Sequence, residues 1–264
     1  MAEIGAYDAE HRGLVIGLAS YLSEIFDPAE DLWDCCPHGS QCWRRPQKPP
    51  PPHRFRVPFV GPRYQSRRIL LVGMNSRDDG MHLEEFKTMA GVLVSLRDGR
   101  TTWGKSAFHY RAAILVSLLS AAQDGQSSEL RPAPEDLIES LLASARVQAV
   151  QCAPGPLEAR RGPKPPMWSN CPPLVVSEQI RALNPRVIVL LGTQTLRAIQ
   201  RFSGLEHEWS TRWRDGGNCF ARGTIQAGND HADLFATYHP SAAGWTRSLN
   251  ALRDSLVQQP LTLA

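Results

Sequence analysis

Short apolar runs recur along the chain, and each stops at glycine or at polar residues. Three of them cover residues 69–72, 187–191 and 234–236. A continuous apolar run of this length is typical of a strand that is buried on both faces of a parallel sheet. Alternation over residues 146–152 predicts a fourth strand. We therefore expect a three-layer α/β/α fold, whose middle layer is a mainly parallel, four-stranded sheet.

Helical spacing of apolar residues fills most of the chain between these strands. It predicts helices over 8–26, 83–96, 108–122, 134–143, 172–183, 193–202 and 247–257. Two proline-rich stretches, 46–62 and 153–170, are predicted as extended strap and loop. A small extra strand is predicted near 224–226. We expect one domain over 1–264, with a helix and a Cys/Pro-rich strap in 1–66 and the α/β core in 67–264.

Composition narrows the class of protein. Of 264 residues, 42% are hydrophobic, which is enough for a full core, and no apolar run has membrane-spanning length. The N-terminus lacks the layout of a signal peptide, so we expect a soluble, cytoplasmic protein. We also expect a monomer without membrane contact.

The net charge of +3 says little about binding partners, but the basic residues are concentrated in one stretch of the chain. Between Cys35 and Arg77 there is no acidic residue. Arginines interleaved with aromatic residues suit a surface that follows a phosphate backbone, although a solvated basic loop is the plainer alternative. The candidate DNA contacts here are Arg44, Arg45, Arg54 and Arg56.

Polar residues follow the strand ends, where open α/β sheets bind ligands. Asn75 comes just after the first strand, and His239 comes after the last, followed by Pro240 and Ser241. Taken singly, each could simply close a turn. Together they place an amide and an imidazole at one edge of the sheet.

The succession "LLVGMN", "NPRVIVLLG" and "YHPS" resembles the uracil-DNA glycosylase superfamily over roughly residues 30 to 245. The resemblance implies a monofunctional DNA glycosylase, which flips a nucleotide out of the helix and hydrolyses its N-glycosidic bond. It also implies that His239 donates a hydrogen bond to the departing base and that Asn75 positions the water. Asp78 would supply a carboxylate that assists the water or the sugar cation, unless it is only an exposed loop charge. Ser241 can bind phosphate. Trp245 would fill the space left by the flipped base, or else pack against the last helix.

Departures from the family pattern affect the substrate. Ser76 and Arg77 stand where the family has Pro-Gly, and Gln148 stands where the family has a base-reading asparagine. Phe86 is the candidate platform for the base, with Tyr64 as an alternative. We expect either uracil or a modified pyrimidine such as glucosylated hydroxymethylcytosine of phage DNA, in a role in repair or in antiviral defence. The alternative is a catalytically weak protein of the same fold that binds DNA or abasic sites.

The six cysteines of a cytoplasmic chain argue against a disulfide scaffold. The iron–sulfur branches of the resembled family place cysteines where this chain has Cys36, Cys42, Cys152 and Cys171. The resemblance therefore implies a 4Fe-4S cluster with these thiolates as ligands. Cys35 could replace Cys36, and zinc or no metal at all are the alternatives.

Overall fold

The computed structural model describes residues 38–42, 59–74, 107–126, 133–150, 165–212, 220–228 and 230–261. The helices predicted over 8–26 and 83–96 lie outside these residues. Within them, no helix has the length and apolar character that crossing a membrane requires.

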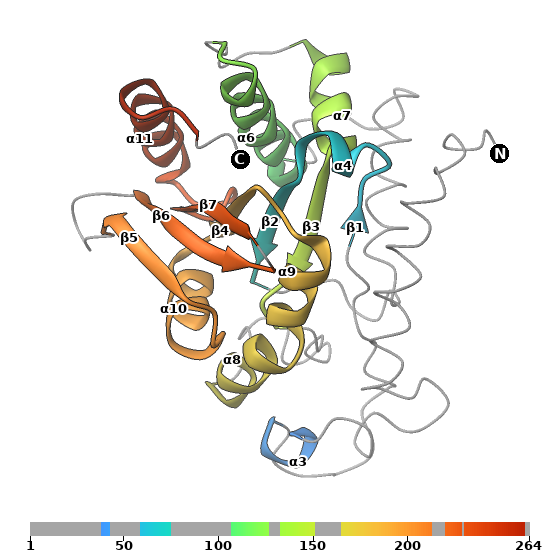
Figure 1. The fold of residues 1–264 in the computed structure, drawn as a ribbon, viewed down its shortest axis with the longest axis vertical. Helices are drawn as coiled ribbons and strands as arrows, with labels where there is room; N and C mark the ends of the chain where they lie inside the picture. Colours follow the sequence, from blue (N-terminus) through green and yellow to red (C-terminus); the bar gives the residue numbers. More distant parts are fainter. Residues whose placement is uncertain are drawn as a thin grey trace, which may run out of the picture.

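A seven-stranded sheet crosses the middle of the described structure (Figure 1), in the order β1-β3-β2-β4-β7-β6-β5. The middle strands β3, β2, β4 and β7 are parallel to one another. The outer pairs, β1 with β3, β6 with β7 and β5 with β6, are antiparallel. The strands are β1 (Phe59–Val60), β2 (Ile69–Gly73), β3 (Ser144–Gln148), β4 (Val187–Leu191), β5 (His207–Thr211), β6 (Phe220–Ala227) and β7 (Asp230–Thr237).

Helices cover both faces of the sheet (Figure 1), because each central strand sends alternate side chains to opposite sides. Ile69 and Leu71 of β2 join a core formed with α6, α7 and α11. Leu70 and Val72 join a second core, formed with α9 and α10. These helices are α6 (Ala107–Gln123), α7 (Pro134–Leu142), α9 (Ser177–Leu183), α10 (Thr193–Phe202) and α11 (Trp245–Gln258).

The predicted α/β class and its three layers are confirmed, but the sheet has seven strands within the described residues and not the predicted four. The three additional strands are antiparallel to their neighbours, and one of them, β6, contains residues 224–226, where the sequence predicts a small extra strand. β1 is only two residues long, and β5 alternates between half-buried and exposed positions, so neither contains a long apolar run. β3 also begins two residues before the predicted strand and ends four residues earlier, at Gln148.

A second correction concerns the proline-rich stretch 153–170, because residues from 165 onward are helical. Helix α8 (Pro165–Cys171) leads into a π-helical turn, η2 (Pro172–Val176), and then into α9. Proline is tolerated in a first helical turn, where no N–H partner is needed. At η2 the wider turn accommodates Pro172 and Pro173, and the hydroxyl of Ser177 donates to the Pro172 carbonyl at 3.0 Å.

Candidate active site at the carboxyl ends of the parallel strands

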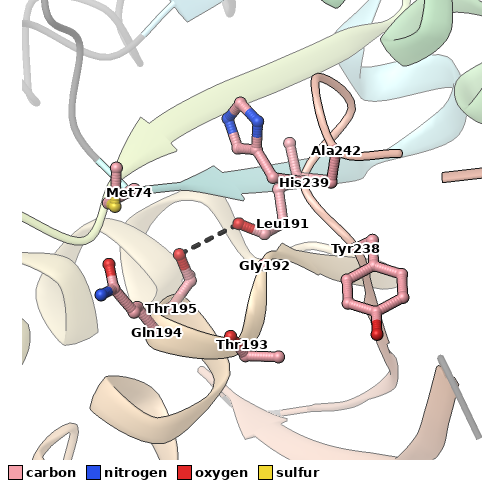
Figure 2. Close-up of a pocket in the computed structure, with 9 residues that line it drawn as sticks. All are labelled: Met74, Leu191, Gly192, Thr193, Gln194, Thr195, Tyr238, His239 and Ala242. Atoms are coloured by element: carbon pink, nitrogen blue, oxygen red, sulfur yellow. Dashed lines mark hydrogen bonds between the residues drawn. The ribbon is translucent and has the colours of Figure 1, made fainter. Parts of the chain in front are cut away.

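A pocket of about 190 Å³ lies at the carboxyl ends of the central strands. β2 sits between β3 and β4, the two strands that follow it in the sequence, so the strand order reverses at β2. Open α/β sheets bind ligands at such a reversal. Figure 2 shows the lining residues, which are Met74, Leu191, Gly192, Thr193, Gln194, Thr195, Tyr238, His239 and Ala242.

Backbone hydrogen bonds fix the strand ends around the pocket. Gly192 donates from its N–H to the carbonyl of Thr237 at 2.8 Å, which joins the ends of β4 and β7. Its φ of 103° and ψ of 152° lie in a region that is essentially restricted to glycine. On the other side, the carbonyl of Met74 accepts from Val150 at 3.0 Å. The pocket is therefore framed by rigid elements.

His239 is half-buried and lies two residues beyond the end of β7. The backbone N–H of Ser241 donates to its Nδ1 at 3.2 Å. Because a backbone N–H can only donate, Nδ1 must be unprotonated, and the ring proton is on Nε2. The imidazole is thus held as a neutral hydrogen-bond donor at the wall of the pocket.

Gln148 is the last residue of β3 and is buried. It pairs in register with Gly73 of β2. A Cβ on Gly73 would lie 2.8 Å from Oε1 of Gln148, so the side-chain amide of Gln148 lies directly against the glycine. Gln148 is not among the residues that line the pocket. Its amide lies against Gly73, at the end of the strand that leads to Met74.

The remaining predicted site residues divide between described and undescribed parts of the chain. Asn75, Asp78 and Phe86 lie outside the described residues, and Asn75 is the residue that follows Met74 in the sequence. Ser241 is exposed and contributes its backbone N–H to His239. Trp245 begins α11 with 3% of its surface exposed and packs in the core, so its burial favours the packing role over a DNA contact.

The predicted DNA contacts Arg44, Arg45, Arg54 and Arg56 also lie outside the described residues. The same basic stretch continues into residues that the structure describes, and there it is paired with acids. Arg67 holds Asp124 at 2.5 Å, and this guanidinium lowers the pKa of the Asp124 carboxyl. Arg63 pairs with Glu139, and Arg68 lies 3.7 Å from Asp230. This end of the stretch is therefore occupied by contacts within the protein.

Two of the four predicted metal ligands come together. Cys42 of α3 (Gly39–Cys42) and Cys171 of α8 are buried in one small cluster with Val150 and Met167. The side chain of Asn170 donates to Sγ of Cys42 at 3.7 Å. Cys36 and Cys152 lie outside the described residues, and Cys152 is two residues beyond Val150. No group of three or more possible metal ligands occurs within the described residues.

Several residues around His239 were not predicted from the sequence. The ring of Phe108 in α6 lies 5.2 Å from the imidazole, centroid to centroid. Arg111 of the same helix donates from Nη1 to the carbonyl of Pro240 at 2.5 Å. Tyr238 lines the pocket, with its ring against Gly244. Only Gly192 carried a usable signal, because a glycine that ends a buried strand marks a turn at the ligand-binding edge.

A comparison with protein families matches residues 134–259 to the uracil DNA glycosylase superfamily. The matched region runs from α7 to the end of α11 and contains Gln148 and His239. β2 and Asn75 precede it. A search of curated proteins finds no match.

Proposed function

The chain belongs to the uracil DNA glycosylase superfamily, and from this premise we propose that it is a monofunctional DNA glycosylase that removes a flipped-out base and leaves an abasic site. The observation that supports this best is the neutral, donor-ready His239 on the wall of a pocket at the strand-order reversal. Members of the superfamily act on DNA, so the partner is DNA.

The proposed reaction breaks the bond between the deoxyribose C1′ and the base nitrogen, and the bonding electrons leave with the base. His239 donates from Nε2–H to an oxygen of the base as negative charge develops there. Asn75 holds a water for attack on C1′. Since an amide is a poor base, the water gives its proton to the departing anion or to solvent, and positioning supplies most of the catalysis.

We propose uracil and a modified pyrimidine, such as glucosylated hydroxymethylcytosine, as equal substrate candidates. The amide of Gln148 offers both a donor and an acceptor, so it suits either a uracil edge or a cytosine-like edge. A repair role follows from the first substrate and a defence role from the second.

The test is base release from duplex and single-stranded DNA carrying uracil, hypoxanthine, hydroxymethylcytosine or glucosylated hydroxymethylcytosine, with abasic sites revealed by alkaline cleavage. His239→Ala should lower the rate of release about 100-fold to 1,000-fold, as expected for loss of one such donor. Asn75→Ala should also lose release, while both variants keep their affinity for DNA. His231→Ala is the matched control, because His231 is exposed near the start of the same strand, β7. Tight DNA binding without release from any of these DNAs would overturn the enzyme proposal in favour of a binding protein.

We also propose a 4Fe-4S cluster held by Cys36, Cys42, Cys152 and Cys171. The donor set fits, because Cys42 and Cys171 are both buried in one apolar cluster and Cys152 follows closely after a member of it. When bound, the cluster would serve as a structural cross-link between the N-terminal strap and the segment around α8. Visible absorbance with matching iron and sulfide content is expected. Cys42→Ser and Cys171→Ser should lose both, and Cys219→Ser should keep them. Zinc, or a metal-free active protein, would contradict the proposal.

A further inference from the structure

We infer that helix α6 sets the position of the catalytic imidazole, with Phe108 and Arg111 as positioning residues for His239. The inference rests on the proposed function, because it concerns the orientation of the group that we assign to the departing base. Neither residue lines the pocket, so both act through His239 and its loop.

Phe108 supports the imidazole ring directly. The two ring centroids are 5.2 Å apart and the ring planes differ by 31°. Phe108 is in turn held by Arg146 of β3, whose guanidinium carbon lies 4.3 Å from the Phe108 centroid. Arg146 is only 8% exposed. A buried cation and an imidazole therefore both contact one phenyl ring, which restricts the rotation of that ring and of His239.

Arg111 holds the backbone of the same loop. Residues three apart share one face of a helix, so Arg111 projects from α6 beside Phe108. Its guanidinium donates to the carbonyl of Pro240, the residue after His239. Within the loop, Ser241 N–H donates to Nδ1 of His239, and Ala242 N–H donates to the His239 carbonyl at 2.8 Å. The internal bonds close the loop, and α6 fixes the closed loop relative to the sheet.

The consequence for catalysis is specific. If Phe108 is lost, the imidazole can turn about its side-chain torsions, and the bond from Ser241 that selects the Nε2–H tautomer weakens. Misplacement of a catalytic group by about 1 Å can cost roughly 100-fold in rate. DNA affinity should change little, since the pocket lining is untouched. The expected pattern is thus a loss in the rate of base release with little change in binding.

The experiment compares Phe108→Leu, which removes the flat ring, with Phe108→Tyr, which retains it, and with Arg111→Met. Leu119→Ala is the control for stability: Leu119 is a fully buried residue of the same helix. Single-turnover rates and DNA dissociation constants are measured below each protein's melting temperature. Phe108→Leu and Arg111→Met should release base about 10-fold to 100-fold more slowly with DNA affinity within a few-fold of the parent. Phe108→Tyr and Leu119→Ala should stay close to the parent rate.

A second readout, the nitrogen chemical shifts of the His239 ring by NMR, does not depend on catalysis. The parent protein should show one neutral tautomer with the proton on Nε2, and Phe108→Leu should show a mixture or a shifted resonance. A parent-like rate and an unchanged tautomer in Phe108→Leu would overturn the inference. If no DNA in the panel releases a base, the enzyme proposal fails, while the tautomer comparison still decides whether α6 positions His239.

Discussion

Adding a single methyl group at Gly73 tests whether Gln148 reads the base. In the Gly73→Ala protein the new Cβ would lie 2.8 Å from Oε1 of Gln148, whereas ordinary contacts begin near 3.4 Å. The amide must therefore move by about 0.6 Å. Gln148 can do this by leaving its preferred rotamer at a cost of about 0.5–1.5 kcal/mol, and alanine in place of glycine in a strand returns roughly 0.5–1 kcal/mol. The net change in stability should be small.

Base recognition should change more than stability does. A shift of about 1 Å in a positioned group can cost about 100-fold, so a 0.6 Å shift predicts roughly a tenfold loss in kcat/KM for base release. The assay is steady-state release from the preferred DNA of the panel, with thermal unfolding measured in parallel. Gln148→Ala should itself lower kcat/KM by removing the amide.

A double-mutant cycle isolates the contact. In the Gln148→Ala background the added methyl group no longer meets an amide, so Gly73→Ala should cost nothing further. The coupling should be about 1.4 kcal/mol, equivalent to the tenfold loss. An equal tenfold loss in both backgrounds would refute the reasoning, because the methyl group would then act on the backbone that leads to Asn75 and not through Gln148.

Three further predictions concern the framework of the site. Gly192→Ala should destabilise the fold by about 1–3 kcal/mol in urea titrations, because its backbone angles are restricted to glycine. Arg222→Met should cost about 3–5 kcal/mol in calorimetry, because it leaves the carboxylate of Asp233 buried without its guanidinium, and unchanged stability would contradict this. Arg67 lowers the pKa of Asp124, so their pairing stabilises the fold above the carboxyl's usual pKa and is lost as the pH falls through the lowered value. Asp124→Asn should therefore lower the melting temperature near neutral pH by a small amount and leave it unchanged at strongly acidic pH.

The sequence identifies strands well when both of their faces are buried. β2 and β4 contain unbroken apolar runs because α helices cover both sides, so their sequences differ plainly from loops and amphipathic helices. β5 reads His-Glu-Trp-Ser-Thr and alternates between half-buried and exposed positions, because it is an edge strand that pairs only with β6. Such a polar segment has no local feature that separates it from a loop. The helix at Pro165–Cys171 departs from the predicted loop for a related reason, since packing overrides a strong local preference against helix.

Site residues also divide into those with a clear sequence pattern and those without one. His239 could be placed at the pocket because it follows a recognisable strand, and strand ends meet at one edge of a parallel sheet. Gln148 was chosen through the family resemblance, within a strand predicted to run to residue 152, and β3 ends at it. Phe108 and Arg111 could not be placed, because the sequence around them predicts an ordinary helix and says nothing about which loop that helix contacts. Trp245 shows the converse: a large aromatic beside a motif allows either contact with a ligand or packing, and its side chain in the core favours packing.

Three elements hold the His239 loop, each by a different contact. α6 contributes Phe108 and Arg111, and the turn after β4 contributes the bond from Gly192 to Thr237. α11 contributes the hydroxyl of Ser248, which accepts from Tyr238 N–H at 3.0 Å. Because all of these constraints act on one short loop, removing any one should loosen the imidazole only partly. Their effects should also be coupled, since a loop released on one side transmits less restraint from the others. In the proposed reaction, directing Nε2–H of His239 toward a departing base is therefore a task shared by the helical layer of α6 and α11 and by the sheet. These shared contacts explain how a half-buried imidazole is kept in one orientation.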